Sequence, residues 1–140
     1  LLRSSIYRAA RVNASDSLLL KSLGVSREDE RRLAPDAQGR RALAAVLQAA
    51  RDPEGRRIRG TLSDIGAARR LPRFPFAALR APTLAIHGTR DRFAPIGLVA
   101  EAAAAIPDSR FEPIEDAGHL CVVTHRQEVF PKVMAFLHSD

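Results

Sequence analysis

The feature that most constrains this chain is a strand, helix and strand pattern between residues 83 and 114. Residues 83–86 form a short, uninterrupted apolar run, which is typical of a strand buried on both faces. Residues 97–106 are rich in alanine and predict a helix. Residues 111–114 predict a second strand, although Pro113 within them is unfavourable in a strand. Because this order produces parallel strands joined by a crossover helix, it predicts an α/β fold.

An acidic and a basic residue follow the two predicted strands. Asp91 follows the first, and His119 follows the second, 28 residues further along the chain. Since the carboxyl ends of parallel strands meet at the same edge of a sheet, we expect these two side chains to lie together. A carboxylate can hold a neutral imidazole in the tautomer whose other ring nitrogen accepts a proton from a hydroxyl nucleophile. Asp91 and His119 are therefore the candidate catalytic residues, with Asp91 orienting the ring and His119 acting as the base.

This pattern resembles the last third of the α/β-hydrolase family. In that family an apolar strand ends in His-Gly, and a catalytic Asp, a proline, a helix, Ile-Pro, a second strand and Gly-His follow. The residues here that match are Ile86, His87, Gly88, Thr89, Asp91, Pro95, Ile106, Pro107, Gly118 and His119. The resemblance implies a hydrolase that acts on an ester or related acyl bond of a small molecule, with no cofactor. It also implies that His87 is a positioning residue.

The nucleophile of a Ser-His-Asp triad has no counterpart in this sequence. The family carries it on a Gly-x-Ser-x-Gly elbow after a strand, near an oxyanion hole formed partly by an earlier loop. The string GVSRE at residues 24–28 lacks the second glycine, and Ser26 is better interpreted as a helix N-cap. Cys121 is expected to be a buried structural cysteine. We therefore expect little or no catalysis from these 140 residues alone, and the choice between a Ser and an Asp nucleophile stays open.

The first part of the chain is predicted to be mostly helical. Helical spacing appears near the N-terminus, in residues 18–23 before Gly24, after Ser26, and in residues 38–50. Residues 71–82 contain three prolines and form a connector. The hydrolase resemblance implies a cap or lid-like region over residues 1–80, followed by a strand-helix-strand-helix unit over residues 81–140. The last helix is expected at residues 126–137, with Pro131 tolerable only in its first turn.

Two parallel strands cannot bury both of their faces, so further strands are expected. The chain also begins at Leu1 inside an expected helix, as a fragment would. The missing strands could come from an absent N-terminal core of the same protein or from self-association through an exposed strand edge. The alternative to a hydrolase is a non-catalytic binding or oligomerisation module left from a truncated enzyme, in which Asp91 and His119 are relics.

The composition of the chain excludes several other classes of protein. With 46% hydrophobic and 27% charged residues, and neither a membrane span nor a signal peptide, the chain is expected to be globular and cytoplasmic. Residues 1–80 hold 17 Arg and Lys against 8 acids, but these cations are scattered without aromatic neighbours, so no specific nucleic-acid binding is expected. A single cysteine excludes an internal disulfide. His125 and His138 are expected at the surface without metal-ligand spacing, so no metal is predicted.

Overall fold

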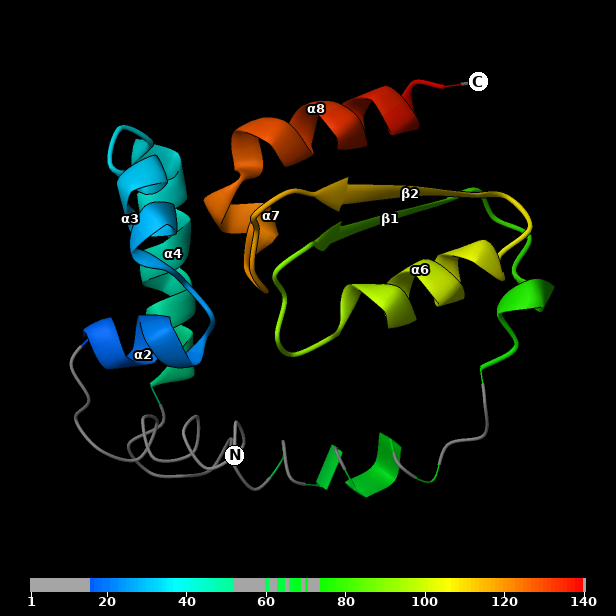
Figure 1. Ribbon diagram of the computed structural model, residues 1–140, viewed down its shortest axis with the longest axis horizontal. Coiled ribbons are helices and arrows are strands. Elements are labelled where there is room, and N and C mark those ends of the chain that lie inside the picture. The colour runs from blue at the N-terminus through cyan, green and yellow to red at the C-terminus, as the bar shows by residue number, and fades with distance from the viewer. Residues whose placement is uncertain are drawn as a thin grey trace.

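The computed structural model describes residues 16–51, 60, 63–64, 66–68, 70 and 74–139 of the chain (Figure 1). Its elements are α2 (Asp16–Ser22), α3 (Arg27–Leu33), α4 (Ala37–Ala50), the 3-10 turn η1 (Phe76–Ala78), β1 (Thr83–Gly88), α6 (Ile96–Ala104), β2 (Ser109–Ile114), α7 (Cys121–Thr124) and α8 (Arg126–Leu137). None of the helices in these ranges is long and apolar enough to cross a membrane.

A small parallel sheet forms the centre of the C-terminal part. β1 and β2 pair in parallel from Thr83 opposite Ser109 to Gly88 opposite Ile114. α6 connects the two strands and packs on one face of the sheet, and α8 packs on the other (Figure 1). The predicted strand-helix-strand order and the parallel pairing are therefore confirmed, and the observed architecture is compatible with part of an α/β fold.

The strand and helix ends differ slightly from the prediction. β1 continues to Gly88, and β2 begins at Ser109, which lies before the predicted start. Pro113 is accommodated because β2 has only one strand neighbour within the described ranges, so a missing backbone N–H on its other side breaks no ladder bond. α6 begins directly after Pro95.

The C-terminal helices show one missed element and one wrong expectation. α7 was not predicted, because a single helical turn carries too little periodicity to be recognised. α8 has the predicted bounds, but Pro131 lies inside the helix and not in its first turn. Its ring removes the hydrogen bond to the carbonyl of Gln127. Gln127 and Pro131 are both exposed, so water can hydrate the freed carbonyl.

The helices α2 to α4 lie close to the predicted positions, although α2 and α4 begin slightly earlier than predicted, at Asp16 and Ala37. Gly24 follows α2 with a φ of 78°, a conformation that favours glycine. Ser26 caps α3 in a reciprocal capping box with Asp29, and Asp36 caps α4 by accepting a hydrogen bond from the backbone N–H of Gly39. The N-terminal helix predicted from Leu2 lies outside the described residues.

The helical region and the C-terminal unit share a hydrophobic core. Val25, Leu33 and Leu43 from the region of α2 to α4 bury their side chains together with Val123 of α7. A second core joins the end of β2 to the start of α8, through Ile114, Ala117, Cys121 and Val129. The α7 turn therefore links the two cores. The division of the chain at residue 80 stays a prediction.

Candidate active site

The structure brings Asp91 and His119 together at the carboxyl edge of the sheet. Nδ1 of His119 lies 2.9 Å from Oδ2 of Asp91, as expected from their positions after β1 and β2. The Asp91 side chain is 1% exposed, whereas that of His119 is 45% exposed. A buried carboxylate thus lies behind an imidazole that faces solvent.

The Asp91 carboxylate is held by several donors. Its Oδ1 accepts hydrogen bonds from the backbone N–H groups of Phe93 (2.7 Å) and Ala94 (3.2 Å). Burial disfavours its charged form, but the hydrogen bonds from His119 and from these two N–H groups outweigh burial and lower the pKa of Asp91 below its usual value. Asp91 is therefore ionised near neutral pH and can accept a hydrogen bond from the Nδ1–H group of His119.

His87 supports the loop that carries Asp91. Its Nε2 lies 2.8 Å from the carbonyl oxygen of Ala94 and 3.3 Å from Oδ2 of Asp91. A proton on this nitrogen donates to the Ala94 carbonyl and thereby ties the end of β1 to the loop. This geometry agrees with the positioning role that the resemblance implies for His87. The sequence did not indicate Ala94 as its partner.

The hydrogen bond to Asp91 selects one tautomer of His119. Since a carboxylate only accepts, Nδ1 of His119 carries the proton, and Nε2 keeps its lone pair. The ring of Phe93 lies against the imidazole, with centroids 4.7 Å apart and planes inclined by 43°. A ring held in this way can accept a proton at Nε2, which is the task of a general base.

Two glycines of the site are required for close packing. A Cβ on Gly88 would lie 2.3 Å from the carbonyl oxygen of Ala117, and one on Gly118 would lie 2.7 Å from that of Gly24. Neither glycine has a positive φ, so close contact with the backbone, and not the conformation of the glycine itself, explains why a side chain does not fit. The Gly118 contact also places the histidine loop directly against the helical region.

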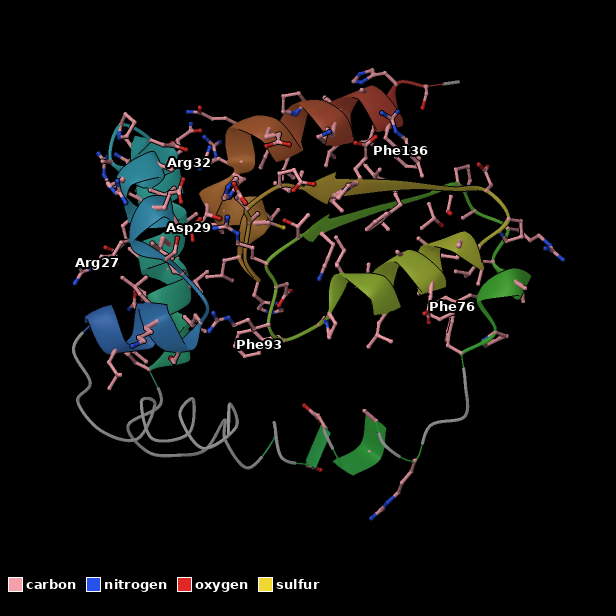
Figure 2. All side chains as sticks on the ribbon, in the orientation of Figure 1. Arg27, Asp29, Arg32, Phe76, Phe93 and Phe136 are labelled. Carbon is pink, nitrogen blue, oxygen red and sulfur yellow. The ribbon has the colours of Figure 1, made fainter. Side chains whose placement is uncertain are left out.

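A groove of about 320 Å³ opens beside His119, between the histidine loop, the Asp91 loop and the segment from α2 to α3. Phe93, labelled in Figure 2, lies in the loop between β1 and α6, and its ring is close to Gly24 at the end of α2. The lining residues are Lys21, Ser22, Gly24, Val25, Ser26, Asp29, Arg90, Arg92, Phe93, Asp116, Gly118 and His119. Both the helical region and the C-terminal unit contribute to this groove.

The hydroxyl and thiol groups near the groove already have structural roles. Ser22 donates to the carbonyl of Leu19, and Ser26 bonds the Asp29 carboxylate at 2.7 Å as the cap of α3. The interpretation of Ser26 as an N-cap is confirmed. Cys121 is buried as expected, and burial together with the negative charge of Asp91 raises the pKa of its thiol. These groups are therefore poor nucleophiles.

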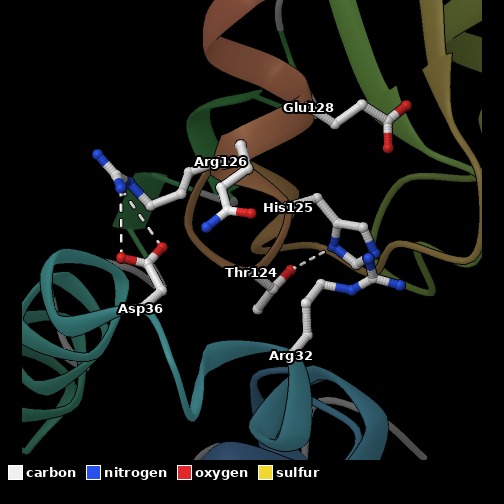
Figure 3. Close-up of a pocket in the computed structure, with 7 residues that line it drawn as sticks. Arg32, Asp36, Thr124, His125, Arg126 and Glu128 are labelled. Carbon is white, nitrogen blue, oxygen red and sulfur yellow. Dashed lines mark hydrogen bonds and ion pairs between the residues drawn. The ribbon is translucent and has the colours of Figure 1, made fainter.

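A second pocket, of about 380 Å³, surrounds His125 at the junction of α7 and α8 (Figure 3). The prediction that His125 is a surface residue is wrong, because its side chain is 3% exposed. Its Nδ1 bonds Thr124 Oγ1 at 2.9 Å and lies 3.7 Å from the Asp29 carboxylate. Burial, and then the positive charge of Arg32, lower the pKa of His125.

One sequence signal could have revealed this burial. Cys121, His125 and Val129 recur at intervals of four residues, and all three are buried in the structure. His138 is exposed as predicted and bonds only the carbonyl of Met134 among the described contacts. Across the described ranges, no group of three His, Cys, Asp or Glu residues is placed to hold a metal ion.

Comparison with known proteins gives two partial similarities. The chain is 38% identical over 60 residues, 43% of its length, to the polyketide synthase ThaQ of Burkholderia thailandensis. It is 30% identical over 63 residues, 45% of its length, to the AB hydrolase superfamily protein YisY of Bacillus subtilis. No family model matches the chain, and no solved structure matches it.

These similarities cover little of either relative. The matched segments span 3% of the polyketide synthase and 24% of the Bacillus protein. The second match suggests a distant relation between part of this chain and the α/β-hydrolase superfamily, which agrees with the small parallel sheet. Activity is a property of the site and not of the fold, so the function is argued from the side chains themselves.

Proposed function

We propose that this chain carries the acid and the base of an α/β-hydrolase active site that cleaves an ester or related acyl bond. Asp91 orients His119, and Nε2 of His119 takes the proton of the nucleophile as it attacks the acyl carbon. The single observation that carries the proposal is the 2.9 Å hydrogen bond between an exposed imidazole and a buried carboxylate.

The partial similarity to an AB hydrolase superfamily protein supports the same reading. Under this proposal, residues 81–140 are the last strand-helix-strand-helix unit of the hydrolase core, and the helical region over residues 1–80 is its cap. The contact of Gly118 with the Gly24 carbonyl supports a cap that closes on the histidine loop. The substrate is a small molecule that enters between the two.

The residues that line the groove do not supply the nucleophile or the hydrogen-bond donors of an oxyanion hole, so other residues have to supply both. The hydroxyls of Ser22 and Ser26 are engaged, and the Cys121 thiol is buried. The same observation favours the second candidate function, a non-catalytic binding or oligomerisation module in which the pair is a relic. Activity measurements separate the two candidates.

The test is hydrolysis of a p-nitrophenyl ester by the longest protein that the gene encodes. Replacing His119→Ala should lower kcat/KM by about 10²-fold to 10⁴-fold, because general base catalysis contributes this much. The matched control is His138→Ala, an exposed histidine outside the groove, which should leave the rate unchanged. Hydrolysis that is insensitive to His119→Ala would overturn the proposal, and its complete absence from the wild type would favour the non-catalytic module.

A further inference from the structure

The charged residues that line the groove beside His119 are not balanced. Three cationic side chains, those of Lys21, Arg90 and Arg92, and two acidic side chains, those of Asp29 and Asp116, line it. A proton transfer from nucleophile to His119 requires none of these cations. The three cations exceed the two acids that line the same groove, so at least one positive charge has no acidic counterpart there.

Both acids already have other partners in the structure. Asp29 is 4% exposed, and its Oδ2 accepts hydrogen bonds from the backbone N–H and the hydroxyl of Ser26. Asp116 forms an ion pair of 2.6 Å with Arg90. Neither carboxylate forms an ion pair with Lys21 or Arg92 among the described contacts.

The side chains of Lys21 and Arg92 form no hydrogen bond or ion pair among the described contacts, and both residues are exposed. They come from two segments of the chain that are far apart in the sequence and that both line the groove. Lys21 lies in the last turn of α2, and Arg92 follows Asp91 in the acid loop. A small anion between them would meet a guanidinium fork and an ammonium group, the two side chains with which proteins most often bind carboxylates and phosphates.

We propose that this groove selects acyl substrates that carry an anionic group, a carboxylate or a phosphate, held by Lys21 and Arg92 beside His119. The inference rests on the proposed function, because it assigns the substrate class of the same site. Phe93, which packs on the His119 ring, supplies apolar surface for the chain between the anion and the acyl carbon. The helical region thus contributes to substrate choice through Lys21.

The test measures binding, so it does not depend on turnover. The Gly118 amide and the His119 ring resonances are followed by NMR while the protein is titrated with monomethyl glutarate, with methyl phosphate, or with the neutral ester methyl valerate. We expect saturable shifts with an anionic ligand and none with the neutral ester. If only one of the two anions causes shifts, the groove selects that anionic group, the carboxylate or the phosphate.

Variants show whether the two cations are responsible. Lys21→Gln and Arg92→Gln should each weaken anion binding by up to about fivefold, the upper end of the range for one exposed ion pair. Arg41→Gln removes the same charge from an exposed position on α4 outside the groove and should leave binding unchanged. Dispersed spectra of each variant verify that it folds.

Two results would overturn the inference. One is equal binding of methyl valerate and monomethyl glutarate, and the other is an equal loss of anion binding in all three variants, which indicates a response to net charge alone. Failure of the proposed function is recognised separately, since it leaves ester hydrolysis insensitive to His119→Ala. A hydrolase that cleaves neutral and anionic esters equally well would retain the proposed function and lose this inference.

Discussion

Single residues decide how closely the loops that carry Asp91 and His119 approach each other. Gly88 ends β1 against the carbonyl of Ala117, two residues before His119. Because Gly88 has no side chain, the loop that carries Asp91 and the loop that carries His119 can lie side by side. A methyl group at this position would not fit. The 2.9 Å hydrogen bond between the pair depends on this approach.

Replacing Gly88→Ala should therefore destabilise the protein by about 1–3 kcal/mol, because overpacking forces the backbone apart. The matched control is Gly97→Ala in α6, where a Cβ would meet nothing within 4 Å. That change should instead stabilise by up to about 1 kcal/mol, because alanine is the better helix former. Urea denaturation measures both, and equal midpoints for the two variants would contradict the packing argument.

The sequence could indicate the residues of the pair but not their surroundings. Asp91 and His119 were predictable because each follows a recognisable strand, and parallel strands end at a common edge. The contributions of Lys21 and Arg92 to the groove were not predictable, because the two residues line one groove only where the segment after α2 approaches the C-terminal unit, at Gly24 and Gly118. The contact of α3 with His125 could not be predicted for a similar reason, since α3 comes from a distant part of the sequence, although the spacing of Cys121, His125 and Val129 does indicate a buried face.

At the scale of elements, His125 joins α3 to the junction of α7 and α8. The groups that face it are Asp29 and Arg32 from α3, Glu128 from α8, Thr124 from α7 and, more remotely, Asp116. Burial and Arg32 lower the pKa of His125 in the folded state, and the three carboxylates oppose this. Protonation would place a second positive charge beside Arg32 inside the contact (Figure 3).

This contact predicts a pH dependence of stability. The unfolded state binds a proton near the ordinary pKa of 6.5, whereas the folded state resists it until a lower pH. The contribution of His125 is therefore complete above the unfolded pKa and is lost as the pH falls from about 7 towards 5. Free energies of unfolding from urea titrations across this range should decrease accordingly.

Replacing His125 tests whether this residue causes the pH dependence of stability. His125→Gln keeps a polar group beside Thr124 but cannot titrate, so its unfolding free energy should vary less between about pH 7 and pH 5. His138→Gln, at an exposed position, should keep the wild-type slope. The paired carboxylates Asp91, Asp36 and Glu112 have lowered pKa values and act at lower pH. An unchanged slope in His125→Gln would contradict this account.

Most elements could be predicted because their patterns are local. The capping box at Ser26, the apolar run of β1 and the amphipathic α4 each depend on residues close together in the sequence. The α7 turn could not be predicted, since four residues carry no period. Pro131 in the interior of α8 also contradicts the local rule, and its exposure to water explains why the helix tolerates it.

At the scale of the whole molecule, the sheet remains incompletely covered within the described ranges. Gly88 is the one buried residue of β1, and Ile114 is the one buried residue of β2. Parallel strands normally bury both faces. Large apolar side chains are also exposed on the flanking helices, among them Leu98 on α6 and Phe130, Met134 and Leu137 on α8.

These surfaces predict association of the isolated 140-residue chain, since unpaired strand edges and apolar patches favour contact with other molecules. Sedimentation velocity should show an average mass that rises with concentration. Met134→Lys should weaken the association, whereas Gln127→Lys, which adds the same charge at a polar exposed position of α8, should not. A monomer at every concentration would argue that the sheet needs no further strand.

The central claim is that Asp91 holds His119 as a base with Nε2 free. The most direct measurement is an NMR spectrum that correlates the ring protons of His119 with its two nitrogens at a pH where the ring is neutral. We predict a proton on Nδ1 in the wild type and a mixture of tautomers in Asp91→Ala, because the selecting hydrogen bond is lost. A proton on Nε2 in the wild type, or identical spectra for both proteins, would contradict the account.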